Sequence, residues 1–178
     1  MGVRAASLVW GLAEAMLFFI VPDVLLSAVA LQDRALALRC CLWALGGALL
    51  GGIALFAASS VAPEAVTGLL VNVPAVSEDM LERVMVDLGD IGPWALFLGP
   101  LTGTPYKLYA ASAPQIGLGL GLFLLVSVPA RLVRFVLVVL IANTVSRWLL
   151  ARWTLTVRRV ILGVFWTVFY AGFFAMMG

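Results

Sequence analysis

The stretch IGPWALFLGPLTGTPYKLYAASAP, residues 91–114, is the part of this chain that decides its fold. It is as apolar as a membrane span, yet it contains four prolines, three glycines and a lysine. Proline removes a backbone donor and kinks a helix. Apolar segments interrupted in this way are typical of broken or re-entrant membrane helices. The stretch therefore predicts a hairpin that enters the membrane and returns to the same side.

The rest of the chain is equally apolar. Of its 178 residues, 64% are hydrophobic and only 11% are charged, whereas a soluble domain is about half apolar and about a quarter charged. A chain this short has no core large enough to bury so much apolar surface, so we expect a membrane protein. The net charge of +2 argues against nucleic-acid binding. The absence of histidine removes imidazole chemistry and histidine metal sites, and we expect neither a metal nor a cofactor.

The predicted architecture is an all-α polytopic membrane protein with a single domain over residues 1–178. Charge-free stretches of roughly 20 residues are long enough to cross the hydrocarbon, and acids between apolar residues at helical spacing indicate a surface helix. The predicted parts are a re-entrant hairpin at 5–31, a transmembrane helix at 40–62, an amphipathic surface helix at 76–90, a second re-entrant hairpin at 91–114, and transmembrane helices at 116–146 and 160–178.

Charge placement supports the hairpin at 91–114. Residues 63–90 carry six acids and one arginine, whereas residues 147–159 carry four arginines and no acid. If 91–114 crossed the membrane completely, those arginines would lie outside the cell, against the positive-inside rule. If it returns to the same side, 147–159 is cytoplasmic and 63–90 is external. The same rule leaves open whether 5–31 is re-entrant or fully spanning.

An internal repeat favours the re-entrant interpretation of 5–31. VPDVLLSAVALQ (21–32) aligned on TPYKLYAASAPQ (104–115) matches at five of twelve positions. Each copy would consist of a hairpin followed by a span, entering from opposite sides. Such inverted repeats place a site where the broken elements meet, near the midplane. In the first repeat, Gly47 and Gly51 have the small-xxx-small spacing of a helix packing face.

Five ionisable residues fall at membrane depth: Glu14, Asp23, Lys107, Arg131 and Arg134. Each costs roughly 2.5–3.5 kcal/mol near the bilayer centre, so they must pair, line a wet cavity or snorkel. Because guanidinium groups match phosphate oxygens, the three cations predict a phosphate pocket. The two acids would then gate the pocket or take up a proton. The alternatives are that the acids pair with cations only to fix the packing, and that Lys107 snorkels to the interface.

Three motifs carry a family resemblance. They are AEAMLFFIVPDVLL (13–26), GTPYKLYAASA (103–113) and PARLVRF (129–135). In this combination, which covers about residues 5–145, the chain resembles the DedA (VTT-domain, SNARE-associated) membrane family, most closely its YqaA-like branch. Two features depart from the family pattern. Pro129-Ala130 stands where the branch has glycine, and the second hairpin has no acid of its own.

The resemblance implies a lipid translocase of the bacterial inner membrane, flippase- or scramblase-like, that moves polyprenyl phosphate or phospholipid between leaflets. It assigns Arg131, Arg134, Lys107 and Tyr106 to the phosphate head group. It assigns Glu14, Asp23, Pro22 and Pro105 to gating or to coupling with protons or cations. A homodimer is compatible with so small a domain. The alternatives are a transporter of a small soluble anion and a non-transporting membrane scaffold; an enzyme is not expected.

Overall fold

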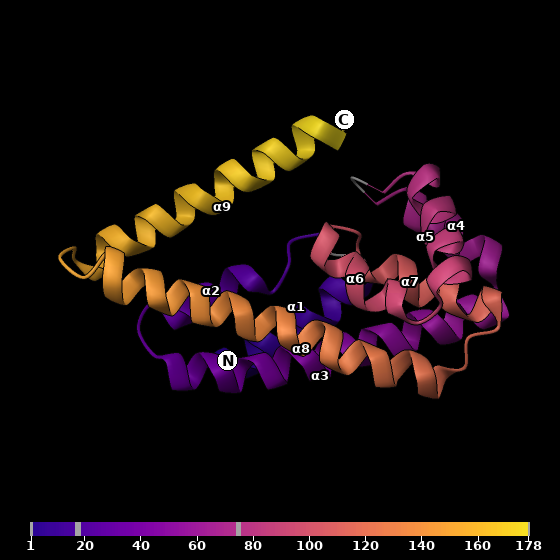
Figure 1. The fold of residues 1–178 in the computed structure, drawn as a ribbon, viewed down its shortest axis with the longest axis horizontal. Helices are drawn as coiled ribbons and strands as arrows, with labels where there is room; N and C mark the ends of the chain where they lie inside the picture. Colours follow the sequence, from indigo (N-terminus) through magenta and orange to yellow (C-terminus); the bar gives the residue numbers. More distant parts are fainter. Residues whose placement is uncertain (1, 17–18, 74–75, 178) are drawn as a thin grey trace.

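The computed structural model describes residues 2–16, 19–73 and 76–177. Helix makes up 84% of the structure, and the described residues contain no strand. The elements are α1 (Val3–Met16), α2 (Asp23–Ala30), α3 (Arg34–Val61), α4 (Pro63–Val71), α5 (Glu78–Ile91), α6 (Trp94–Thr102), α7 (Tyr106–Ser112), the 3-10 turn η1 (Ala113–Ile116), α8 (Leu120–Thr144), the π-helical turn η2 (Val145–Leu149) and α9 (Leu155–Met177) (Figure 1).

Three helices are long and apolar enough to cross a membrane, namely α3, α8 continued through η2, and α9. This confirms the prediction of an all-helical chain with three helices that could span a membrane, and it suggests a membrane protein. The bounds differ from the predicted 40–62, 116–146 and 160–178. For α3 the reason is its N-cap: Asp33 accepts a hydrogen bond of 2.9 Å from the backbone N–H of Leu36. Capping, not the edge of the charge-free stretch, starts the helix, so Arg34 and Arg39 lie within it.

The segments 5–31 and 91–114 each form two short helices separated by a break. The helices α1 and α2 have 14 and 8 residues, and α6 and α7 have 9 and 7. None reaches the roughly 20 residues that a crossing needs. Between α6 and α7, Gly103 has a φ of +99°, a left-handed conformation that favours glycine. Pro105 follows in an extended conformation and starts α7.

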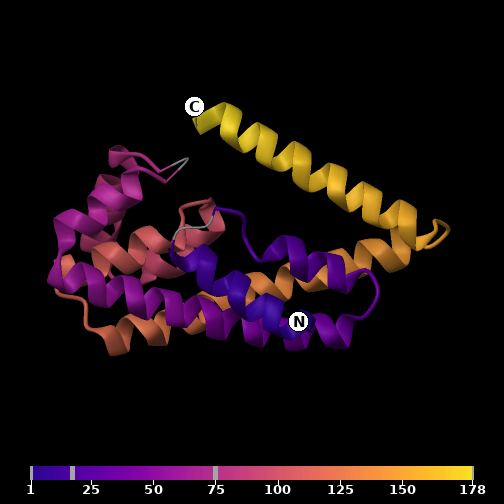
Figure 2. The same ribbon diagram turned by 180° about the vertical axis from the view of Figure 1, so that it is seen from behind.

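The two long helices α3 and α8 pack against each other and form the centre of the fold (Figures 1 and 2). The shorter helices are distributed in a crossed pattern. The first helix of each pair packs on the long helix that follows it, α1 on α3 and α6 on α8. The second helix of each pair packs on the long helix that follows the other pair, so α2 contacts α8 and α7 contacts α3.

The glycines of α3 confirm the predicted packing face. A Cβ at Gly47 would lie 2.8 Å from the backbone nitrogen of Leu12 and the backbone carbon of Leu8. A Cβ at Gly51 would lie 2.8 Å from Ala15. The backbones of α1 and α3 therefore approach closely because these positions have no side chain. The neighbouring Cys40 and Cys41 are free and buried, packed with residues of α2 and α8.

The predicted amphipathic helix at 76–90 is confirmed as α5. Met80, Val84 and Leu88 are buried, and Val76 is buried just before the helix. The acids between them are exposed. Ser77 caps the helix by accepting a hydrogen bond from the backbone N–H of Met80 at 3.3 Å.

The last helix, α9, stands apart from the others. It leaves the end of α8 and runs back over the molecule at an angle (Figures 1 and 2). Near its C-terminal end, the ring centres of Phe173 and Phe174 lie 5.1 and 5.0 Å from that of Phe19. No residue of its most apolar window is buried. Its packing contacts are mainly with α2. The exposed apolar surface of α9 is the kind of surface that lipid covers.

Candidate functional site: a charged cavity beneath the last helix

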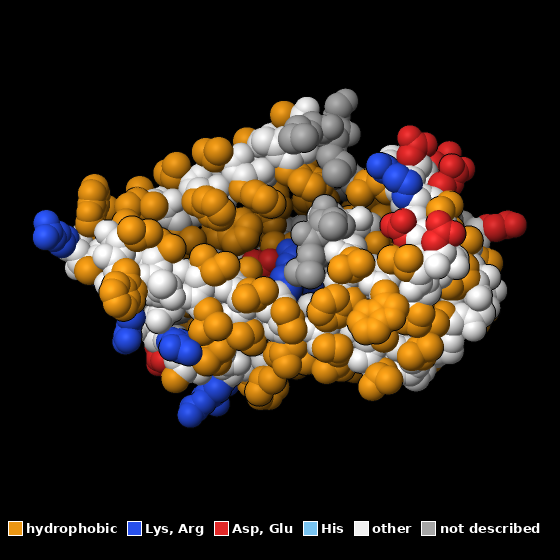
Figure 3. Space-filling model, in the orientation of Figure 1, with side chains coloured by type: hydrophobic (Ala, Val, Ile, Leu, Met, Phe, Trp, Pro, Cys, Tyr) orange, Lys and Arg blue, Asp and Glu red, His pale blue; other side chains and the backbone are white. Residues whose placement is uncertain are grey.

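A cavity of about 370 Å³ lies between α7, α8, α9 and the break that joins α1 to α2. Figure 3 shows a hollow between α9 and the body of the molecule, with acidic and basic side chains on its floor. Four charged residues line the cavity: Glu14, Asp23, Lys107 and Arg134. Arg134 comes from near the middle of the apolar helix that runs from Leu120 to Leu149, so the charged groups lie far from either end of that helix.

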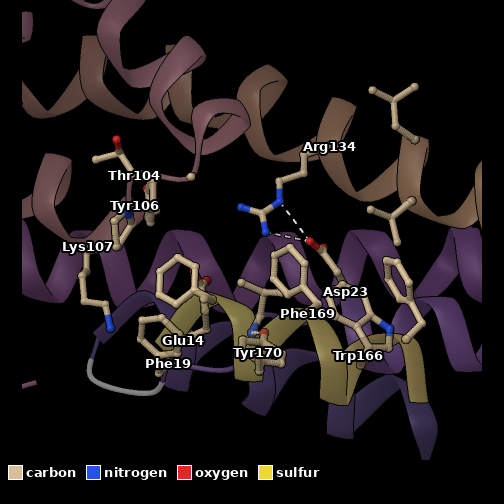
Figure 4. Close-up of a pocket in the computed structure, with 17 residues that line it drawn as sticks. Glu14, Phe19, Asp23, Thr104, Tyr106, Lys107, Arg134, Trp166, Phe169 and Tyr170 are labelled. Atoms are coloured by element: carbon tan, nitrogen blue, oxygen red, sulfur yellow. Dashed lines mark hydrogen bonds and ion pairs between the residues drawn. The ribbon is translucent and has the colours of Figure 1, made fainter. Parts of the chain in front are cut away.

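Arg134 and Asp23 form one of two ion pairs across the fold. Nη2 and Nε of Arg134 donate to Oδ2 of Asp23 at 2.7 and 2.9 Å (Figure 4). The other carboxylate oxygen, Oδ1, is buried without a hydrogen-bond partner in the described part of the chain. The Arg134 side chain keeps 23% of its surface exposed, whereas that of Asp23 keeps 3%. The guanidinium therefore presents part of its surface to the cavity while the carboxylate is covered.

Arg131 and Glu14 form the second ion pair, deeper in the protein. The guanidinium carbon of Arg131 lies 4.4 Å from the centre of the Tyr106 ring and 5.2 Å from that of Phe135. Such cation–π contacts stabilise a desolvated guanidinium. Its Nε and Nη1 atoms have no hydrogen-bond partner within the described residues. Arg131 is not part of the cavity lining, whereas its partner Glu14 is.

Lys107 and Tyr106 begin α7 and are both buried. Lys107 reaches toward Phe19 and Glu14 (Figure 4), and its Nζ lies 5.9 Å from the centre of the Phe19 ring. With only 2% of its surface exposed, Lys107 does not snorkel to an interface. The Tyr106 hydroxyl donates to Ser127 Oγ at 3.1 Å. The Tyr106 ring fits against α3 because a Cβ at Gly52 would lie 3.1 Å from its Cζ.

The two prolines predicted to act in gating lie at corresponding places. Pro22 immediately precedes Asp23 at the start of α2, and Pro105 immediately precedes Tyr106 at the start of α7. Pro105 lines the cavity. Pro22 is buried, and its neighbour in the chain, Asp23, lines the cavity instead. Each proline therefore ends a break and sets the first residue of the following helix at the charged centre. Asp23 at a helix N-terminus is favoured by the helix dipole.

One wall of the cavity was not anticipated. It consists of aromatic residues of α9: Phe165, Trp166, Phe169, Tyr170 and Phe173. Trp166 Nε1 donates to Ser27 Oγ at 3.0 Å, and the Tyr170 hydroxyl accepts from the backbone N–H of Val21 at 2.9 Å. The sequence signal for this wall was the three-to-four-residue spacing of the aromatics, which places them on one helix face.

The arrangement differs from a purely cationic pocket. The predicted group of Lys107, Arg131 and Arg134 is divided, because two of them face the cavity and Arg131 lies behind Glu14. The formal charges of the four charged lining residues sum to zero. Asp23 accepts from Nε and Nη2 of Arg134, so an anion that binds this edge of the guanidinium would compete with Asp23. Among the described residues, no group of three or more His, Cys, Asp or Glu side chains is arranged to hold a metal ion. No family model, curated protein or solved structure matches this chain.

Proposed function

We propose that this protein is an integral membrane lipid translocase, flippase- or scramblase-like, which moves phosphate-bearing lipids such as polyprenyl phosphate or phospholipid between leaflets. The observation that carries the proposal is the charged cavity itself. It lies at mid-length of an apolar helix and is covered on one side by the exposed apolar helix α9. A lipid head group needs polar contacts at that depth while its chains remain in hydrocarbon, and this site supplies both environments.

The chemistry of the lining suits a phosphate. Arg134 offers a fork of donors that matches phosphate oxygens, and Lys107 supplies a second positive charge from the opposite wall. Asp23 occupies the Arg134 fork in the structure. A phosphate would exchange with Asp23 at that guanidinium, and the released carboxylate would then need a proton or cation. Ion coupling in this protein would therefore act through Asp23, with Glu14 held by Arg131 as the second acid.

The proposal includes an inverted repeat with re-entrant hairpins at 5–31 and 91–114. Two hydrogen bonds support it, because each long helix holds the end of the other repeat's short helix. Ser59 of α3 donates to the carbonyl of Ala111 in α7 at 2.6 Å. Asn143 of α8 donates to the carbonyl of Ala30 in α2 at 2.9 Å. The crossed packing of α2 and α7 agrees with this exchange, as does the resemblance to the DedA (VTT-domain) family.

We place the protein in the bacterial inner membrane, with 147–159 cytoplasmic and 63–90 external. This follows from the basic and acidic flanks and the positive-inside rule. The elongated surface of α9, which is exposed in the single chain, is available to lipid and to a second copy in a homodimer.

A membrane scaffold is the second candidate, and one observation favours it. Both acids at the site are paired with an arginine, which is what a purely structural role for the charges requires. A soluble-anion transporter is less favoured because the α9 wall of the cavity is aromatic. An experiment can distinguish both alternatives from lipid transport. A scaffold moves no lipid, whereas transport of a soluble anion is inhibited by inorganic phosphate and not by lipid.

The test is leaflet exchange in vesicles that contain the purified protein. Fluorescent phosphatidylglycerol, phosphatidylcholine and polyprenyl phosphate are each followed by loss of signal to a membrane-impermeant quencher. We expect wild-type protein to exchange the phosphate lipids faster than empty vesicles do, and Arg134→Gln to be about tenfold slower, equivalent to about 1.4 kcal/mol of barrier. The matched control is Arg152→Gln, which removes a positive charge from an exposed turn. Exchange by folded wild-type protein at the empty-vesicle rate would refute the proposal.

A further inference from the structure

A second cavity adjoins the charged one along the groove between α8 and α9. Its volume is also about 370 Å³. The two cavities share Val138, Phe165 and Trp166 as lining residues. The two cavities are therefore adjacent at this point, and the charged groups lie in the first of them. We call the second cavity the tail groove.

The lining of the tail groove is almost entirely aliphatic and aromatic. Among the described residues that line it, the polar side chains are Ser27 and Arg158. Both make hydrogen bonds within the protein. Ser27 accepts from Trp166 and donates to the carbonyl of Val24 at 3.0 Å. The nitrogens of Arg158 donate to Ser146 Oγ, Ala151 O and Trp153 O at 3.0 to 3.1 Å. Apart from Arg158 at its end, which keeps its positive charge, the groove is lined by apolar groups and hydrogen-bonded Ser27 and Trp166, and such a lining suits hydrocarbon.

The length of the site matches one lipid chain. Its α8 side runs from Arg134 in the charged cavity to Val145 in the tail groove. A helix rises about 1.5 Å per residue, so this side is roughly 16 Å long. Half of a bilayer's hydrocarbon core is about 15 Å thick. The groove is therefore long enough to hold a hydrocarbon chain of this length, laid along α8 toward Arg158.

We infer that the tail groove binds a hydrocarbon chain of the lipid whose phosphate occupies the charged cavity. This inference rests on the proposed function and adds to it the place and direction of the chain. The phosphate lies at Arg134 and Lys107, the chain passes between Val138 and Trp166, and its end lies near Arg158. Trp166 is held at the junction by its hydrogen bond to Ser27. The site thus recognises the head and the chain of one amphipathic molecule.

The experiment uses the full-length protein in vesicles of phosphatidylethanolamine and phosphatidylglycerol. Two photoreactive phosphatidic acid probes are compared, one with a diazirine beside the head group and one with it at the chain end. After irradiation, labelled residues are mapped by mass spectrometry. We expect the first probe to label α9 around Phe169 and the second to label around Ile141 and Ile161, which line the tail groove. Equal labelling by both probes, or chain-end labelling around Thr167 on the other side of α9, would overturn the inference.

Variants that fill the tail groove sharpen the result. Ala142→Phe places a ring in the groove, and we expect it to abolish labelling by the chain-end probe while leaving the head-group probe in place. Because Ala142 is partly buried, Ile141→Trp serves as a second variant from an exposed groove position. The matched control is Ala171→Phe, which lies on the other side of α9. Chain-end labelling that survives in both folded groove variants would also overturn the inference.

Failure of this inference is distinguishable from failure of the proposed function. Cross-linking reports where a lipid binds whether or not the protein transports it. Wild-type protein that exchanges lipid between leaflets but shows no chain-end labelling in the groove would refute the groove and leave translocation standing. Groove labelling without leaflet exchange would support the binding site and refute translocation.

Discussion

The α1–α3 part of the molecule and the α6–α8 part share an order of two short helices and a long one, but their long helices differ in what they carry. In the alignment of the proposed repeat, Gly51 of α3 corresponds to Arg134 of α8, and Ala48 corresponds to Arg131. The small residues of α3 allow α1 to pack backbone to backbone. The arginines of α8 instead demand acidic partners, which come from α1 and α2.

The difference shows that the two parts are complementary rather than equivalent. Both acids of the site belong to the first part and all three cations belong to the second. Neither part satisfies its own buried charges. Because an unpaired charge at membrane depth is costly, the two ion pairs fix how the parts are placed against each other. The same exchange of partners occurs in the hydrogen bonds from Ser59 and Asn143.

The largest expected effect comes from breaking the deeper ion pair. Arg131→Met leaves Glu14 buried, with 4% of its surface exposed, without its partner. Breaking a buried pair from one side costs about 3–5 kcal/mol of the free energy of unfolding. Thermal or denaturant unfolding in detergent measures it. The control is Arg131→Met combined with Glu14→Leu, which removes both charges and should recover most of the loss. A single variant as stable as wild type would mean that the pair does not join the two parts.

A smaller effect is expected from the α3 packing face. Gly47→Ala adds a methyl group 2.8 Å from backbone atoms of α1, and overpacking of this kind costs about 1–3 kcal/mol. Gly46 is the matched control on the same helix, because a Cβ there meets nothing within 4 Å. Gly46→Ala should leave stability unchanged or raise it by up to about 1 kcal/mol. Equal behaviour of the two variants in unfolding measurements would contradict close packing of α1 on α3.

The smallest effect tests whether the two crossed hydrogen bonds are equivalent. We expect Ser59→Ala and Asn143→Leu each to lower the free energy of unfolding by about 0.5–1.5 kcal/mol. Ser60→Ala is the control, since the exposed Ser60 hydroxyl bonds only within its own helix, to Ala57 O. Costs that differ by several-fold between Ser59 and Asn143 would show that the two parts hold each other unequally.

Several local features could be predicted because they depend on nearby residues. The amphipathic helix α5 followed from the spacing of Val76, Met80, Val84 and Leu88, and the α3 packing face from Gly47 and Gly51. Helix ends were less predictable. The span expected at 40–62 begins at Arg34 because Asp33 caps it, and a single capping hydrogen bond is easily overlooked beside a long apolar run.

The ionisable residues that the structure brings together could be singled out because such side chains are expensive in hydrocarbon wherever they occur. Their pairing was not predictable. Glu14 and Arg131 are separated by 117 positions, and Asp23 and Arg134 by 111, so only the packing of α1 and α2 against α8 selects which acid meets which arginine. The aromatic wall of α9 was missed because Phe165, Trp166 and Tyr170 also suit an ordinary lipid-facing helix.

Composition and the placement of charges were sufficient to predict an all-helical chain with long apolar helices and broken apolar segments. The reason is that a bilayer penalises each exposed polar group independently of the fold. Which charges face the cavity is a property of the tertiary structure. Packing turned Arg134 toward the cavity and enclosed Arg131 between Tyr106 and Phe135. Contacts between residues more than a hundred positions apart depend on how whole helices pack, and no local pattern encodes that.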